Sequence, residues 1–130
     1  MILDTSAVIA ILRQEPEAQA FAHAIQEHPH GHISAVNYFE ACIVADRDRD
    51  PVMSRRLDEF CHSASVVIVP ADERHARIAR EAYRDFGKGS GHPARLNFGD
   101  CFAYALATTA NEPLLFKGND FAHTDVKRAL

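Results

Sequence analysis

The first six residues of the chain are Met1-Ile2-Leu3-Asp4-Thr5-Ser6, and the interpretation of the whole sequence starts from them. Three apolar residues run directly into an acid and two hydroxyl residues, and the apolar run Ala7–Leu12 follows. This order predicts a short buried strand leading into a helix, with Asp4 at the edge where open α/β sheets bind their ligands. Thr5 and Ser6 suit the helix start, because hydroxyl oxygens accept hydrogen bonds from unpaired backbone N–H groups. Aspartate is also common in plain turns, so this stretch alone leaves the role of Asp4 open.

Length and composition predict a single globular domain over residues 1–130. The chain is long enough for a real core, and 47% hydrophobic and 25% charged residues are ordinary values for such a domain. No apolar run approaches the ~20 residues that span a bilayer. The first residues contain Asp4 and lack the basic region of a signal peptide. We therefore expect a cytoplasmic protein.

Charge and cysteine usage weigh against other classes of protein. The net charge is −4, whereas nucleic-acid binders usually carry a basic excess. A polyanion can still bind if a metal ion sits among clustered acids and basic residues surround it. Cys42, Cys61 and Cys101 have no CxxC spacing, which argues against a disulfide scaffold and a structural zinc site. We expect all three to be small buried side chains.

Strand-like and helix-like segments alternate along the chain. The expected strands after residues 1–3 are His32–Ser34, Val66–Val69 and Leu114–Phe116. Five helices are expected after Ala7–Leu12. Two of them begin at Pro16 and Pro51, and the other three span Ala35–Asp46, Ala71–Phe86 and Phe98–Ala110. This alternation predicts a three-layer α/β/α sandwich with a mostly parallel central sheet.

Several expectations concern burial. The β-branched run Val66–Val69 reads as a strand buried on both faces. The helix over residues 35–46 is expected to bury Val36, Phe39 and Ile43, with Glu40 at the border of that stripe. The helix ending at Phe86 is expected to carry Ala79, Ala82, Tyr83 and Phe86 inward. The alternating charges of Arg47–Asp50 suggest a solvated junction between helices.

Four carboxylates are expected to meet at one edge of the sheet. Right-handed crossovers place the carboxyl ends of parallel strands on the same edge, and Asp4 and Asp120 follow such ends. Glu40 lies just beyond another strand, and Asp100 opens an almost wholly apolar helix, where the helix dipole alone also favours an acid. Clustered carboxylates repel each other and raise their pKa values unless a cation neutralises them. All-oxygen ligation favours Mg²⁺ or Mn²⁺.

An acidic cluster of this kind suits metal-assisted phosphoryl chemistry, in which the ion lowers the pKa of bound water and stabilises charge on a phosphodiester. No nucleophilic Ser–His or Cys–His arrangement, P-loop or GxGxxG motif stands out in the sequence. The glycine-rich stretch Gly87–Arg95 is either a plain connector or a mobile loop that offers Lys88, His92 and Arg95 to phosphates.

Four segments, in this order and spacing, resemble a PIN-domain ribonuclease and, more narrowly, the VapC-type toxins of toxin–antitoxin pairs. They are Met1–Ser6, Asn37-Tyr38-Phe39-Glu40-Ala41, Leu96-Asn97-Phe98-Gly99-Asp100-Cys101-Phe102-Ala103 and Leu114-Leu115-Phe116-Lys117-Gly118-Asn119-Asp120-Phe121. The resemblance implies a magnesium-dependent endoribonuclease that cuts RNA, a cognate VapB-type antitoxin and commonly a homodimer. It also implies that Asp4 and Asp100 are the main metal ligands, with Glu40 ligating directly or through water. In our hypothesis for the reaction, Thr5 or Ser6 orients a ligand or a phosphate oxygen.

The sequence departs from the resemblance at the fourth acid. Many relatives carry an acid two residues before the Asp-Phe pair, where this chain has Gly118. Asp120 either takes the fourth catalytic role or braces the loop, and the number of metal ions stays open. Asp125 is a structural or outer-shell candidate.

Other functions remain possible at this stage. One alternative is a non-catalytic PIN-like domain that binds RNA or protein, and another is a receiver-type signalling domain. The second fits less well, because the strand ending at Val69 leads to Pro70-Ala71 and not to an acid. The amphipathic helices Ala7–Leu12 and Pro16–His28 either pack in the core or present an apolar groove to a partner helix.

Overall fold

Four parallel strands form the centre of the molecule. The computed structural model describes residues 1–47 and 49–130. The strands are β1 (Ile2–Leu3), β2 (His32–Ser34), β3 (Val67–Val69) and β4 (Leu114–Leu115), in the order β3-β2-β1-β4. Ile2 pairs with His32 on one side and with Leu114 on the other, so β1 is central. The carboxyl ends of the strands therefore share one edge, as predicted.

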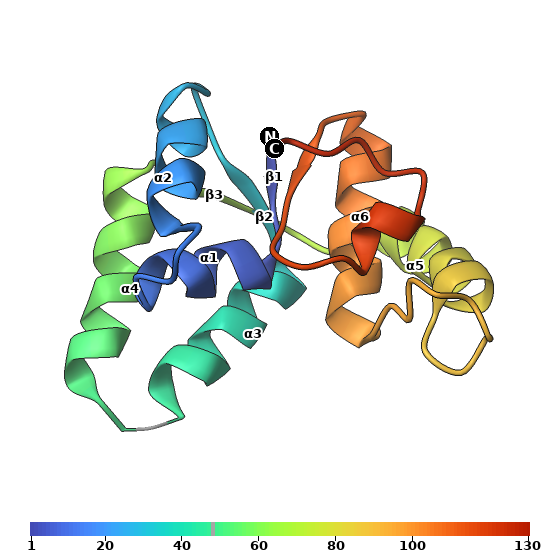
Figure 1. Ribbon diagram of the computed structural model, residues 1–130, viewed down its shortest axis with the longest axis horizontal. Helices are drawn as coiled ribbons and strands as arrows, with labels where there is room; N and C mark the ends of the chain where they lie inside the picture. Colours follow the sequence, from blue (N-terminus) through green and yellow to red (C-terminus); the bar gives the residue numbers. More distant parts are fainter. Residues whose placement is uncertain (48) are drawn as a thin grey trace.

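The helices form a layer on each face of this sheet. They are α1 (Thr5–Leu12), α2 (Ala18–Gln26), α3 (Ala35–Asp46), α4 (Pro51–Ser63), α5 (Glu73–Phe86) and α6 (Phe98–Ala110), followed by the short 3₁₀ helix η1 (Phe121–His123). Figure 1 shows α1–α4 on one side and α5 and α6 on the other. Because successive strand residues point to opposite faces, Leu3 packs in the α1–α4 core and Ile2 in the α5–α6 core. The predicted three-layer α/β/α sandwich is confirmed.

Polar side chains fix where the helices begin. Ser34 and Asn97 cap α3 and α6. The expectation that Thr5 or Ser6 caps the first helix was wrong: Asp4 is the cap, and its carboxylate accepts a hydrogen bond from the Ser6 backbone N–H. The helix α5 begins two residues later than expected, because Asp72 caps it by accepting from the His75 N–H.

Two predicted burial patterns were wrong. The strand β3 lies at the edge of the sheet, so Val67 and Ile68 are exposed and not buried on both faces. The helix α3 buries Asn37, Ala41 and Ala45, leaving Phe39 66% and Ile43 50% exposed. Small residues on the buried face of α3 allow a close approach to its neighbours, and the large side chains then point outward.

Smaller expectations had mixed outcomes. Tyr83 is 49% exposed and does not point inward as predicted, whereas Ala79 and Ala82 are buried. Cys101 is buried, but Cys42 and Cys61 are only partly buried; all three are free thiols. The interpretation of Arg47–Asp50 as a solvated junction includes Asp48, which lies outside the described residues. Within the described part of the chain, no helix combines the length and the apolar character that crossing a membrane requires.

Candidate active site

Asp4 lies at the carboxyl end of the central strand and is almost fully buried. Its Oδ2 accepts hydrogen bonds from the Ser6 N–H at 2.9 Å and from the Ser6 hydroxyl at 2.5 Å. Its Oδ1 is buried and has no hydrogen-bond partner among residues 1–47 and 49–130. Burial raises the pKa of this carboxyl, although the bonds from Ser6 oppose the shift. An unpartnered buried carboxylate oxygen is costly, and its presence calls for an explanation.

Asp100 lies in the first turn of α6 and faces the same region. Asn97 and Asp100 form a reciprocal capping box: the Asp100 N–H donates to Asn97 Oδ1 at 2.8 Å, and the Asn97 N–H donates to Asp100 Oδ2 at 2.9 Å. Burial is the main reason that the pKa of Asp100 is raised to about 7, and repulsion from Asp4, Asp120 and Glu40 raises it further. The hydrogen bond from the Asn97 N–H lowers the pKa and so opposes this shift. The acid thus both caps α6 and belongs to the acidic cluster.

Glu40 reaches the cluster from α3 across a glycine of α6. Its carboxylate lies against Gly99, where an added β-carbon would come within 2.8 Å of Glu40 Oε1 and closer still to Oε2. Glycine inside a helix costs about 1 kcal/mol relative to alanine. Gly99 therefore leaves the space that the Glu40 carboxylate occupies.

Asn37 holds the three helices of the site together and was not predicted as a site residue. It is completely buried, and its Nδ2 donates to the Gly99 carbonyl at 3.0 Å and to Thr5 Oγ1 at 3.4 Å. The Thr5 hydroxyl in turn donates to the Asn37 carbonyl at 3.1 Å. These bonds join α1, α3 and α6, and they engage the Thr5 hydroxyl inside the protein. The sequence signals were its place near the start of an expected helix and its presence in the segment Asn37–Ala41 that carries the resemblance.

Replacing Asn37 with alanine is expected to lower the free energy of unfolding by about 1–3 kcal/mol, because buried donors and acceptors lose their partners. Chemical denaturation measures the change. Asn119→Ala is the matched control: this asparagine is exposed, and its replacement is expected to stay within about 0.5 kcal/mol. Equal effects of both substitutions would contradict the structural role of Asn37.

The loop after β4 is tied to the site through Ser6. The Lys117 N–H donates to Ser6 Oγ at 3.0 Å, so the hydroxyl bridges this loop and Asp4. The Lys117 ammonium pairs with Glu15 at 2.5 Å and Glu17 at 3.2 Å. Ser6 thus orients Asp4, and the ion pairs hold the loop against the segment between α1 and α2.

The two late acids differ in their surroundings. Asp120 is exposed, immediately before η1, and its charge contributes to the raised pKa of Asp100. Asp125 accepts a hydrogen bond from the Tyr104 hydroxyl at 2.7 Å. Burial and this carboxylate raise the pKa of Tyr104 to about 12. Asp120 therefore interacts with the acidic cluster, whereas Asp125 has a structural partner.

The two predicted basic residues belong to the connection between α5 and α6. Both Lys88 and Arg95 are exposed in the segment between α5 and α6. Lys88 borders a hollow between these helices, and Arg95 has a left-handed backbone, with φ of 51°. The largest contributions to the pKa shifts of Asp4 and Asp100 come from burial, from hydrogen bonds and from neighbouring acids.

The donor chemistry of the cluster fits a hard divalent cation. Asp4, Glu40 and Asp100 supply only oxygen atoms, and the unpartnered Asp4 Oδ1 is available as a donor. Across residues 1–47 and 49–130, no three His, Cys, Asp or Glu side chains already stand in a metal-holding arrangement. The acids nevertheless influence one another electrostatically, because Asp4, Asp120 and Glu40 all help to raise the pKa of Asp100.

In metal-free buffer, stability is expected to fall as pH rises from about 4 to about 7. The pKa of Asp100 is about 7 in the folded protein against an ordinary value of 3.8, and that of Asp4 shifts in the same direction. The folded state therefore binds more protons than the unfolded state in this window, and deprotonation disfavours folding. Melting temperatures measured across this range test the slope. Asp100→Asn should flatten it, and an unchanged slope would contradict the assignment.

Comparison with known proteins places the chain in a family. The PIN domain matches residues 1–127. Ribonuclease VapC28 of Mycobacterium tuberculosis is 59% identical over 130 residues, covering 100% of this chain and 98% of that protein. Ribonuclease VapC42 of the same species is 46% identical over 129 residues, covering 99% and 98%.

Solved structures show the same fold. M. tuberculosis VapC20, described as a sarcin-ricin loop cleaving toxin, matches with a TM-score of 0.72 at 12% identity, covering 96% of this chain and 95% of that one. A toxin-antitoxin complex from Klebsiella pneumoniae matches with a TM-score of 0.68 at 19% identity, covering 93% and 89%. The chain belongs to the PIN domain family and is a relative of the VapC ribonucleases.

Proposed function

We propose that this protein is a magnesium-dependent endoribonuclease and the toxin of a type II toxin–antitoxin pair. The observation that carries the proposal is the unpartnered Oδ1 of buried Asp4 in an acidic cluster with Asp100, whose pKa is about 7. The identity to proteins named ribonucleases over the full chain supports the same activity. Choice of RNA over DNA rests on those relatives.

Each residue of the cluster has a separate task in this proposal. Asp4 and Asp100 would hold the ion, with Glu40 as a direct or water-mediated ligand. When bound, Mg²⁺ or Mn²⁺ supplies a water of lowered pKa and stabilises charge on the phosphodiester. Ser6 keeps the Asp4 carboxylate in position, and Asp120 adds negative charge beside Asp100.

The test is RNA cleavage by the purified protein as Mg²⁺ or Mn²⁺ is titrated, with a chelator as control. Cleavage is expected only with the ion. An ion that binds the folded state alone also stabilises it, by about 2.7 kcal/mol at a hundredfold excess over its Kd. The melting temperature should therefore rise with Mg²⁺. A melting temperature that does not respond to either ion, together with chelator-resistant cleavage, would refute the metal-dependent mechanism.

Two protein partners follow from the proposal. The first is a VapB-type antitoxin, supported by the VapC relatives and by a cavity of about 470 Å³ between α1, α2 and α4, lined in part by Ile11, Ile25 and Phe60. The second is another copy of the chain, supported by Phe39 and Ile43, which lie exposed one turn apart on α3. Copurification with a small co-encoded protein tests the first partner, and sedimentation of the free chain tests the second.

The alternative is a non-catalytic domain that binds RNA or protein. It predicts binding of RNA without cleavage at any concentration of Mg²⁺ or Mn²⁺. The intact set Asp4, Glu40 and Asp100 favours the enzyme. The same cleavage assay separates the two functions.

A further inference from the structure

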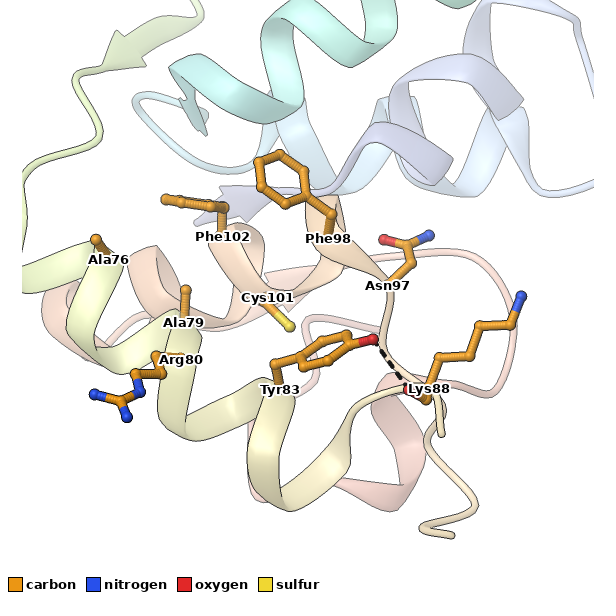
Figure 2. A pocket seen from close by; sticks show the side chains of 9 residues that line it. All are labelled: Ala76, Ala79, Arg80, Tyr83, Lys88, Asn97, Phe98, Cys101 and Phe102. Carbon is orange, nitrogen blue, oxygen red and sulfur yellow. Dashed lines mark hydrogen bonds between the residues drawn. The ribbon is translucent and has the colours of Figure 1, made fainter. Parts of the chain in front are cut away.

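A hollow lies between α5 and α6 (Figure 2). Its volume is about 490 Å³, in the range of small-molecule sites. Its lining is predominantly apolar and is formed by Ala76, Ala79, Arg80, Tyr83, Lys88, Asn97, Phe98, Cys101 and Phe102. The metal-centred mechanism above makes no use of this feature.

Aromatic rings form the walls of the hollow. Phe98 is 71% exposed and Tyr83 is 49% exposed, although both are large rings that ordinarily prefer burial. The Phe98 and Phe102 rings lie 5.4 Å apart between centroids, and the Tyr83 hydroxyl donates to the Lys88 carbonyl at 3.1 Å. Exposed rings held in place by neighbours offer flat faces on which a nucleobase can stack.

Cationic side chains lie at the border of the hollow. Within the part of the chain that the structure describes, neither Arg80 nor Lys88 forms an ion pair. By contrast, Arg77 on the same helix is paired with Glu73 at 2.6 Å. Cations without acidic partners beside an apolar, aromatic surface match a ligand that combines phosphates with an aromatic base.

One residue, Asn97, connects the hollow to the candidate active site. Asn97 lines the hollow and exchanges two hydrogen bonds with Asp100. Phe98 is the next residue and begins α6. A ligand in the hollow therefore lies beside the residue that positions one of the candidate metal ligands.

We propose that this hollow binds one unpaired base of single-stranded RNA next to the phosphodiester that is cut. Phe98 and Tyr83 stack on the base, and Arg80 and Lys88 contact flanking phosphates. This inference rests on the proposed ribonuclease function and assigns a substrate subsite to it. It makes an unstacked base part of what the enzyme recognises, in agreement with the general preference of RNA-binding proteins for single-stranded targets.

The test measures binding separately from cleavage. An Asp4→Asn protein in chelator is titrated with a short oligouridylate carrying one 2-aminopurine, whose fluorescence reports stacking, and with the same RNA lacking that base. Phe98→Leu in this background keeps an apolar side chain but removes the ring. It should weaken binding of the 2-aminopurine RNA about tenfold, the loss of one base–aromatic contact, and leave the abasic RNA almost unaffected. Its melting temperature should match that of the parent, because Phe98 is exposed.

A charge-matched pair tests the phosphate contacts. Arg80→Gln and Arg77→Gln remove the same charge from the same helix, but only Arg80 lines the hollow. The first should weaken RNA binding severalfold more than the second. Equal affinity of Phe98→Leu and parent, equal binding of the intact and abasic RNA, or equal effects of the two arginine variants would overturn the proposal.

Two further outcomes distinguish base binding in the hollow from dimerisation through the hollow and from the proposed nuclease function. If Phe98→Leu alters sedimentation of the free chain while RNA affinity is unchanged, a second copy occupies the hollow and the base-binding proposal fails. If the native chain cleaves no RNA with Mg²⁺ but the base-dependent binding persists, the hollow retains its assignment and the nuclease function fails.

Discussion

Replacing Asp4 with asparagine is expected to reduce metal-dependent RNA cleavage at least about a thousandfold. A metal ion contributes several kcal/mol of charge stabilisation in the transition state, and 1.4 kcal/mol corresponds to a tenfold change in rate. Asp4 is central to the proposed metal site, because it is nearly fully buried and its Oδ1 has no hydrogen-bond partner among residues 1–47 and 49–130. Initial rates of cleavage at saturating Mg²⁺ measure the effect.

The same substitution should leave the fold intact. Asparagine retains an oxygen that can accept the hydrogen bond from the Ser6 N–H, and it removes a charge whose burial is unfavourable. In chelator the variant should therefore melt at or above the temperature of the parent, but Mg²⁺ should no longer raise that temperature. Asp125→Asn is the matched control, since it changes the charge equally at an acid bound to Tyr104. Full activity of Asp4→Asn would refute the assignment of Asp4, and lost activity of both variants would show that the effect is not specific to the cluster.

The fold was predictable because its signals are local. Three of the four parallel strands are short apolar runs, and polar caps such as Ser34 and Asn97 mark helix starts within a few residues. The errors concern features that neighbouring segments decide. A β-branched run looks the same in a central strand and in the edge strand β3. In α3 the apolar residues are numerous enough to suggest the wrong face, and contacts with other helices select the face with Asn37 and Ala41.

In the candidate site, too, local features could be predicted from the sequence and long-range contacts could not. The acids at strand and helix ends follow from the order of elements, so Asp4 and Asp100 could be identified from residue type and position. The contacts that support them could not, because they join residues distant in the chain: Asn37 to Gly99, and Ser6 to Lys117. Likewise, nothing in the sequence indicates that Gly99 lies against the Glu40 carboxylate.

Replacing Gly99 with alanine is expected to lower cleavage about ten- to a hundredfold with little change in stability. Alanine favours helix over glycine by about 1 kcal/mol. The added β-carbon would collide with the Glu40 carboxylate, which is the far end of a flexible side chain and can move away. The substitution therefore displaces the carboxylate without deleting it. Cleavage rates as a function of Mg²⁺ concentration, together with chemical denaturation, measure both consequences.

A double-mutant cycle with Glu40→Ala tests whether the effect of Gly99→Ala passes through Glu40. If alanine at position 99 acts by displacing the carboxylate, it should add almost nothing once Glu40 has been removed. Glu40→Ala alone should reduce activity at least as much as Gly99→Ala, because it removes the side chain entirely. Losses that multiply in the double variant would mean that Gly99 matters for another reason, such as its carbonyl bond with Asn37. Full activity of Gly99→Ala would mean that catalysis does not require the Glu40 carboxylate at the position it occupies over α6.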